Sequence, residues 1–161
     1  MAVDMFLKLG DIKGESQDKM HKEEIDVLAW SWGISQSGTT HLGGGSGAGK
    51  ASFQDISVTS YYEKSTPHVM TKCATGDHIP EATLTVRKAG GKQVEYIIYT
   101  LKDIIVTSVS TGGSGGEDRL TANFSLNFGA FETIYKPQDE KGNLGADIAF
   151  NYDIAANEKK S

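Results

Sequence analysis

Hydrophobic and polar residues alternate with a period of two along most of this chain. The clearest run is residues 120–128, where Leu120, Ala122, Phe124, Leu126 and Phe128 alternate with Thr121, Asn123, Ser125 and Asn127. Residues 3–9 and 82–87 repeat the pattern, with Val3, Met5, Leu7 and Leu9 in one and Ala82, Leu84 and Val86 against Thr83, Thr85 and Arg87 in the other. Such runs predict half-buried strands with one face in a core and the other in solvent.

Turn signals separate these runs and set the number of strands. The segment AGGK at 89–92 predicts a hairpin between residues 81–88 and 93–101, and TGGSGG at 111–116 separates residues 103–110 from 117–128. With further runs at 27–36, 52–62, 131–136 and 146–154, the count is about nine strands. The pattern therefore predicts a mainly β, antiparallel protein, either a barrel or a sandwich.

One helix is expected at about residues 66–75. Ser65 can cap its start, Pro67 lies in the first turn and Gly76 follows the last turn. An apolar stripe at helical spacing consists of Val69, Met70, Cys73 and Ala74. We expect this helix to lie over the sheet or to close one end of a barrel.

Composition indicates a single domain over residues 1–161 that does not bind nucleic acid. The chain has 16 basic and 21 acidic residues, a formal charge of −5, whereas phosphate binding requires concentrated Lys and Arg. Cys73 is the only cysteine, so no internal disulfide can form. The N-terminus lacks the features of a signal peptide and no run is long enough to span a membrane. These features predict a protein that folds in the cytoplasm without inserting into a membrane.

The segment from Gly44 to Lys50 resembles a phosphate-binding loop, G-x-x-x-x-G-K. The Ser or Thr that would hold magnesium is replaced by Ala51, and a β-like run follows where the loop requires a helix. We therefore interpret residues 38–50 as a long glycine-rich connection between two strands.

Two further patterns suggest chemistry and fail on physical grounds. The segment GGSGG matches a hydrolase nucleophile elbow at Ser114, but a strand follows it and no histidine occurs after His78. His68, Cys73 and His78 are spaced five apart, which turns helical ligands away from one another. We expect no catalytic residue, no metal site and no cofactor.

Residues 28–35 have an unusual division between two faces. Leu28, Trp30, Trp32 and Ile34 predict a heavy core face, while Ala29, Ser31, Gly33 and Ser35 on the other face are all small. An uncharged small face suits close approach of another surface or the wall of a cavity or channel. An ordinary exposed strand whose residues are small by chance is the alternative.

Five segments together resemble one protein family. They are EEIDVLAWSWG, GGGSGAGK, KSTPHVMTKC, LTVRKAGGKQVEY and STGGSGGEDRLT, within a similarity from Ala2 to about Phe128. On these segments the chain is similar to the haemolysin-coregulated proteins, which form the tube of the bacterial type VI secretion system. Residues 130–161 resemble the family less, and from about residue 156 we expect a flexible tail.

The resemblance implies a closed or nearly closed barrel, similar to phage tail tube proteins, that forms a homo-hexameric ring. It also implies stacked rings, a contractile sheath, a spike protein, effectors held in the lumen, and secretion through the type VI system without a signal peptide. Lumen-facing residues would be Ala29, Ser31 and Gly33. Subunit-interface loops would contain Gly43, Gly44, Gly45, Ser46, Gly47 and Lys50, and also Glu117, Asp118 and Arg119, whose opposite charges could instead fix their own loop.

A rival class is a monomeric ligand-binding barrel, in which the small residues would line an internal pocket. An enzyme that uses a loop serine or a nucleotide is a weaker rival, since the partner residues are missing.

Overall fold

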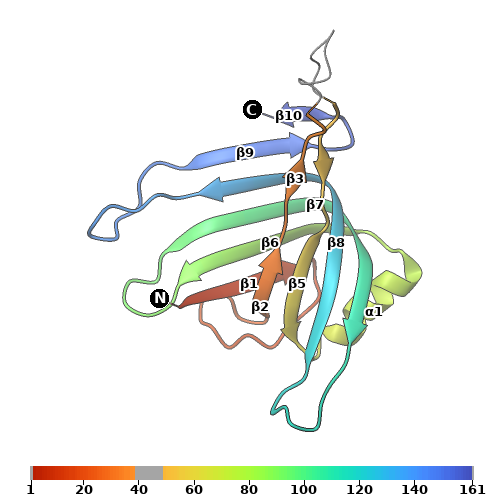
Figure 1. Cartoon of the computed structure of the whole chain (residues 1–161). Helices are drawn as coiled ribbons and strands as arrows, with labels where there is room; N and C mark the ends of the chain where they lie inside the picture. Colours follow the sequence, from red (N-terminus) through yellow and green to blue (C-terminus); the bar gives the residue numbers. More distant parts are fainter. Residues whose placement is uncertain (1, 39–48, 161) are drawn as a thin grey trace.

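The computed structural model describes residues 2–38 and 49–160, and within them one helix and ten strands (Figure 1). The strands are β1 (Val3–Leu9), β2 (Ile25–Ser31), β3 (Ile34–Ser35), β4 (Ser52–Phe53), β5 (Ile56–Tyr61), β6 (Ile79–Lys88), β7 (Glu95–Thr111), β8 (Thr121–Tyr135), β9 (Ile148–Asp153) and β10 (Glu158–Lys160). The helix is α1 (Thr66–Thr75). Within these residues, no helix has both the length and the apolar character needed to cross a membrane.

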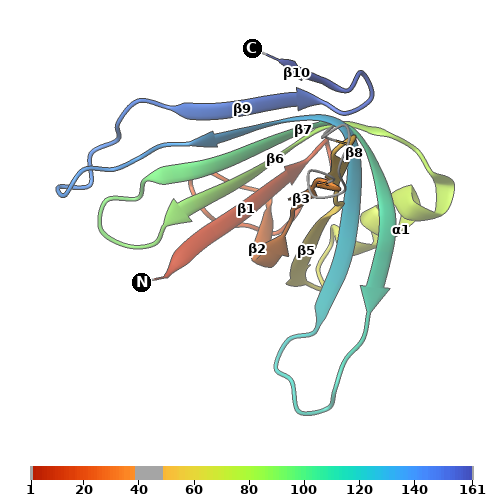
Figure 2. The same cartoon turned by 45° about the horizontal axis from the view of Figure 1, so that its top comes forward.

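Six strands close into an antiparallel barrel. Their order is β8-β5-β2-β1-β6-β7, and pairing between β7 and β8 closes the circle. β9 and β10 extend the sheet beyond β8, while β3 and β4 form a separate two-stranded arm (Figures 1 and 2). The sequence pattern was compatible with a barrel or a sandwich. Because β7 pairs with β8 and closes the sheet on itself, the fold is a barrel.

Ten strands are observed where about nine were expected, because β3, β4 and β10 are additional strands while two expected pairs are each one continuous strand. β7 and β8 each run unbroken through a position where the sequence suggested a break, at Asp103 and Gly129. Asp103 has φ +55°, and a Cβ at Gly129 would lie 3.4 Å from the Asp103 carboxylate. The buried face of β8 also changes there, from the even residues 122–128 to Phe131. Both strands therefore bend without ending.

The expected helix is confirmed. α1 ends at Gly76, which has φ +72° and donates its N–H to Lys72 O, and Pro67 lies in its first turn. Ser65 precedes the helix, but its hydroxyl donates to Glu63 and makes no cap hydrogen bond to the helix. Val69 is fully buried, while Cys73 is half-buried against the core, so α1 packs beside β7 and does not close the barrel end (Figure 1).

The barrel interior is filled by the side chains that alternation predicted. Leu7, Leu9, Leu84, Leu126 and Phe128 are all at most 4% exposed. Three positions differ from the expected core: Val3 is 39% exposed, Leu120 is 44% exposed, and Met5 is half-buried. Val3 begins β1 and Leu120 directly precedes β8, whereas Met5 packs against the edge of the core.

The polar face of β6 was expected in solvent and is buried instead. A strap, residues 11–24, connects β1 to β2 and covers this face, so that Thr85 is 4% and Arg87 only 2% exposed. The Arg87 guanidinium donates to Asp18 at 3.0 Å and to Asp4 at 3.1 Å. His21 of the strap stacks on Phe6 with ring centroids 4.4 Å apart. The expectation failed because period two describes one strand and carries no signal for a distant loop that covers it.

The tail was also expected to be flexible from about residue 156. Residues 158–160 instead form β10, which pairs with β9 at residues 151–153. The structure thus places these residues in a strand, and flexibility of the tail stays a prediction.

Candidate functional site

The small residues of β2 lie on the outer face of the barrel. The pairing of β2 with β5 is interrupted by a bulge between Val27 and Ala29, which shifts the alternation by one residue. As a result Ala29 and Ser31 are exposed, while Trp30 and Trp32 pack against the core. Leu28 was expected in the core but lies at the bulge and is 39% exposed.

Beyond Ser31 the chain leaves the barrel, and two further expectations change. Ile34, which was expected in the core, is 45% exposed because it belongs to the β3–β4 arm. Gly33 lies between β2 and β3, and a Cβ there would lie 3.1 Å from the side-chain oxygen of Gln54. Gly33 therefore faces Gln54, whereas Ala29 and Ser31 remain open.

Neighbouring strands continue the same kind of surface across the barrel. The pairings place Ser31 opposite Ser57, Ser57 opposite Ser125, and Ser125 opposite Ser108, which makes one row of four serines across β2, β5, β8 and β7. The next row is Ala29, Thr59, Asn123 and Ser110. With Thr107 and Asn127, these two rows are called the small-polar face below.

Hydrogen bonds between strands hold the side chains of this face in place. Thr59 Oγ1 donates to Asn123 Oδ1 at 2.6 Å, and the Ser125 hydroxyl lies 2.6 Å from that of Ser108 and 2.7 Å from that of Thr107. The surface is thus uncharged, short in side chains and ordered by its own contacts. The sequence identified only its β2 part, although the same alternation of small polar residues is visible in residues 57–59 and 123–127.

Charged residues gather at one end of the small-polar face. The Arg119 guanidinium lies 3.6 Å from the centre of the Tyr61 ring, and Tyr61 follows Thr59 along the outward face of β5. Glu15, Asp26 and Glu63 line the same hollow, and burial raises the pKa of Asp26 and of Glu63 above their ordinary values.

The described parts of the two predicted interface regions, the β3–β4 arm and the 112–120 connection, lie at opposite ends of the molecule. The Arg119 guanidinium contacts Tyr61 of its own chain, and the Glu117 N–H donates to Ser114 O within the 112–120 connection. This connection and the β3–β4 arm point away from each other (Figure 1). Lys50 is exposed at the outer end of the arm, before β4, and the residues Gly43, Gly44, Gly45, Ser46 and Gly47 lie outside the described part of the chain.

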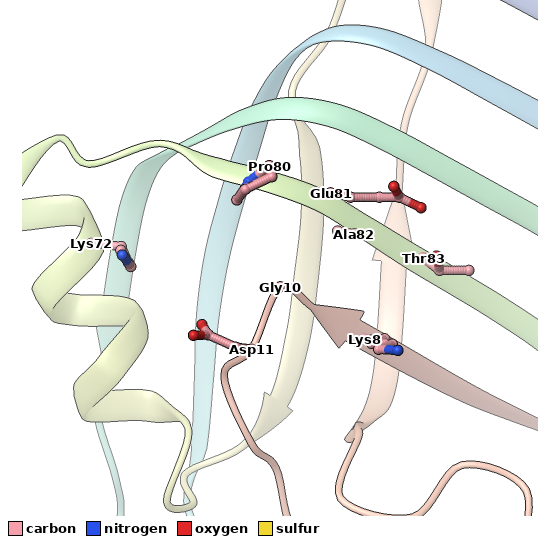
Figure 3. A pocket seen from close by; sticks show the side chains of 8 residues that line it. All are labelled: Lys8, Gly10, Asp11, Lys72, Pro80, Glu81, Ala82 and Thr83. Atoms are coloured by element: carbon pink, nitrogen blue, oxygen red, sulfur yellow. The ribbon is translucent and has the colours of Figure 1, made fainter.

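A second hollow, of about 580 Å³, lies between α1 and the paired strands β1 and β6 (Figure 3). Lys8 and Lys72 line it together with Asp11 and Glu81. Because both charges are present in equal number, the lining favours neither an anionic nor a cationic ligand.

The residues of the rejected nucleophile and metal motifs do not form a site together. Ser114 lies in an exposed loop that leads into β8, and His78 Nδ1 contacts the Asp103 carboxylate at 2.6 Å. Among residues 2–38 and 49–160, no three His, Cys, Asp or Glu side chains come together as metal ligands would.

Comparison with known proteins adds family and structural relatives. Residues 6–135 match the family described as "Type VI secretion system effector, Hcp". The chain is 60% identical over 159 residues to "Protein hcp1" of Pseudomonas aeruginosa, with 98% of each chain covered. A solved structure of a type six secretion system protein superposes with a TM-score of 0.93 at 28% identity, covering 99% of this chain and 100% of that one. Hcp1 from Salmonella typhimurium gives a TM-score of 0.83 at 38% identity, with the same coverage.

Proposed function

Because this chain belongs to the Hcp family of type VI secretion system proteins, we propose that six copies close into a ring and that rings stack into the inner tube. Effector proteins occupy the lumen, a contractile sheath surrounds the tube and a spike protein caps it. The protein starts in the cytoplasm and is secreted through the type VI system. Its role is structural and not enzymatic.

The small-polar face is the observation that carries this proposal. A channel that holds or passes varied proteins gains from a wall without bulky or charged side chains, and two rows across four strands have this character. Ala29 and Ser31 would face the lumen, together with Ser57, Ser125 and Ser108. Gly33 would lie at the edge of the wall, beside Gln54.

The rival, a monomeric ligand-binding barrel, is poorly supported. It needs small residues around an internal pocket, but Ala29 and Ser31 point outward and the interior is occupied by side chains such as Leu9, Leu84 and Leu126, each 0% exposed. A ligand inside this barrel would have to displace the core.

The β3–β4 arm and the 112–120 connection differ from each other and lie at opposite ends of the molecule, which also supports stacking. A contact between two different ends of a molecule repeats along an axis, since each new copy presents the same free end as the last. The proposed interface segments are residues 43–50, of which Lys50 lies at the β3–β4 arm, and residues 117–119 in the connection at the other end. Ordering a glycine-rich segment such as residues 38–50 is unfavourable by about 1–2 kcal/mol per residue, so docking on another subunit would have to offset it.

Light scattering on a sizing column tests the ring directly. We expect a mass of about six chains, and negative-stain images with a central hole. The measurement at low and high salt separates a ring held by packing from one held by surface charge, since salt screens the latter. A monomer at both salt concentrations would overturn the proposed ring.

The lumen assignment is tested by Ser31→Gln. Because Ser31 is exposed, we expect an unchanged melting temperature and ring mass, but at least about a fivefold loss of effector retention as the longer side chain enters the channel. Ser57→Gln, in the same row, should reproduce this loss, while Thr71→Gln on the exposed side of α1 should not. Equal retention in all three variants would remove the small-polar face from the channel wall.

A further inference from the structure

Asp55 is a carboxylate fixed at the margin of the small-polar face. It lies between β4 and β5, directly before Ile56. Its Oδ2 accepts a hydrogen bond from Thr107 Oγ1 of β7 at 2.6 Å, and its Oδ1 accepts one from Asn127 Nδ2 of β8 at 2.9 Å. Side chains of two strands thus hold this carboxylate. Asp55 is half-buried and both donors are exposed, so the carboxylate lies at the edge of the exposed surface.

The same hydrogen bonds place Asp55 on the outward face that carries the serine row. Thr107 Oγ1 contacts Asp55 and also the Ser125 hydroxyl, which in turn contacts Ser108. Asp55 is therefore continuous with the small-polar face and not with the core.

Neutral donors leave the charge of this carboxylate uncompensated. Within the described residues, the ion pairs involve other acids, and no Lys, Arg or His nitrogen lies within 4.0 Å of Asp55. The two rows of the face contain only Ala, Ser, Thr and Asn. Asp55 is thus a negative charge hydrogen-bonded directly to this face, on the side away from Arg119, whereas the next outward carboxylate, Asp103, is paired with His78.

We propose that Asp55 is the charge-selecting residue of the channel wall, and that this tube accepts cargo through surfaces that present Arg or Lys to it. The inference rests on the proposed ring, in which Asp55 would be repeated once per subunit as a band of negative charge around the lumen. A band of like charges in a narrow channel raises the local concentration of opposite charge.

The geometry favours a guanidinium in particular. Each carboxylate oxygen has two acceptor positions, and the wall uses one of each, so one position on each oxygen stays free. A guanidinium can donate to both oxygens at once, which an ammonium group does less well. Arg on the cargo surface should therefore be preferred to Lys.

The test uses the full-length ring and a fluorescein-labelled peptide of alternating Arg and Ser, with a Glu-Ser peptide for comparison. Binding is followed by fluorescence anisotropy at low salt and at about 0.5 M salt, where surface charges are screened. For Asp55→Asn we expect an unchanged ring mass, at least about a fivefold weaker affinity for the Arg-Ser peptide, and a smaller dependence on salt. The Glu-Ser peptide should bind neither protein.

Two variants separate the position of the charge from its amount. Asp77→Asn removes the same charge in the exposed segment after α1, outside the small-polar face, and should bind the Arg-Ser peptide as the wild type does. Ser57→Asp, combined with Asp55→Asn, returns a carboxylate to the wall two residues along β5 and should restore most of the affinity.

The outcomes distinguish this inference from the proposed function. A wild-type protein of monomer mass overturns the ring, and this inference with it. Rings that bind the Arg-Ser peptide equally well with and without Asp55 overturn this inference alone, as does an equal loss in Asp77→Asn.

Discussion

Replacing Arg87 with Met is expected to lower the free energy of unfolding by about 3–5 kcal/mol, because the change leaves two carboxylates without their buried partner. The Arg87 side chain is 3% exposed, lies 4.9 Å above the Phe6 ring, and pairs with Asp4 and Asp18. Asp4 belongs to β1 and Asp18 to the strap, so one guanidinium connects three segments. Urea denaturation at a fixed protein concentration measures the loss, since assembly would otherwise change the apparent stability.

A matched change at an exposed arginine gives the control. Arg119→Met removes a guanidinium that lies over Tyr61, and we expect a loss of at most about 1 kcal/mol. A loss of that size in Arg87→Met would show that the strap does not depend on the buried pair.

The same pair predicts how stability changes in acid. The hydrogen bond from Arg87 lowers the pKa of Asp18 to about 2, from an ordinary value of 3.8. The unfolded chain therefore takes up this proton first, so the contribution of Asp18 is present above about pH 4 and is lost as the pH falls towards 2. Asp18→Asn should reduce the change in stability across this window.

Gly14→Ala is expected to destabilise the protein by about 1–3 kcal/mol, or to prevent folding, because its methyl group would meet backbone. Gly14 lies where the first part of the strap crosses its last part, and the Gly14 N–H donates to Glu23 O at 2.7 Å. A Cβ there would lie 2.7 Å from the carbonyl carbon of Glu24 and 2.8 Å from Ile25 Cα. Neither atom can rotate away as a side chain would, so the strap and the start of β2 would have to separate.

Gly112→Ala is the matched control for this crossing. No heavy atom lies within 4 Å of a Cβ built at Gly112, so we expect a change within about 0.5 kcal/mol in either direction. Thermal melts of the two variants and the wild type make the comparison. Equal melting temperatures for Gly14→Ala and Gly112→Ala would mean that the crossing is loose in solution.

The sequence by itself determined those features whose signals are local. The bounds of α1 follow from Pro67 and Gly76, which limit the backbone at their own positions, and the hairpin at residues 89–94 follows from its two glycines. The alternation of β8 identified its buried residues up to Phe128. The small face of β2 was predicted correctly at Ala29 and Ser31, although the bulge put Leu28 on the surface.

Only the tertiary structure decided which of these local patterns meet. Four strands far apart in the sequence contribute to the small-polar face, and the register between them, not the composition of any one, aligns Ser31, Ser57, Ser125 and Ser108. Burial of Arg87 depends on a strap more than 60 residues earlier in the chain. The alternation of hydrophobic and polar residues indicates which face of a single strand is buried. Closure of the barrel, cover by a loop and the position of Asp55 depend on long-range pairing, which one sequence read along its length does not contain.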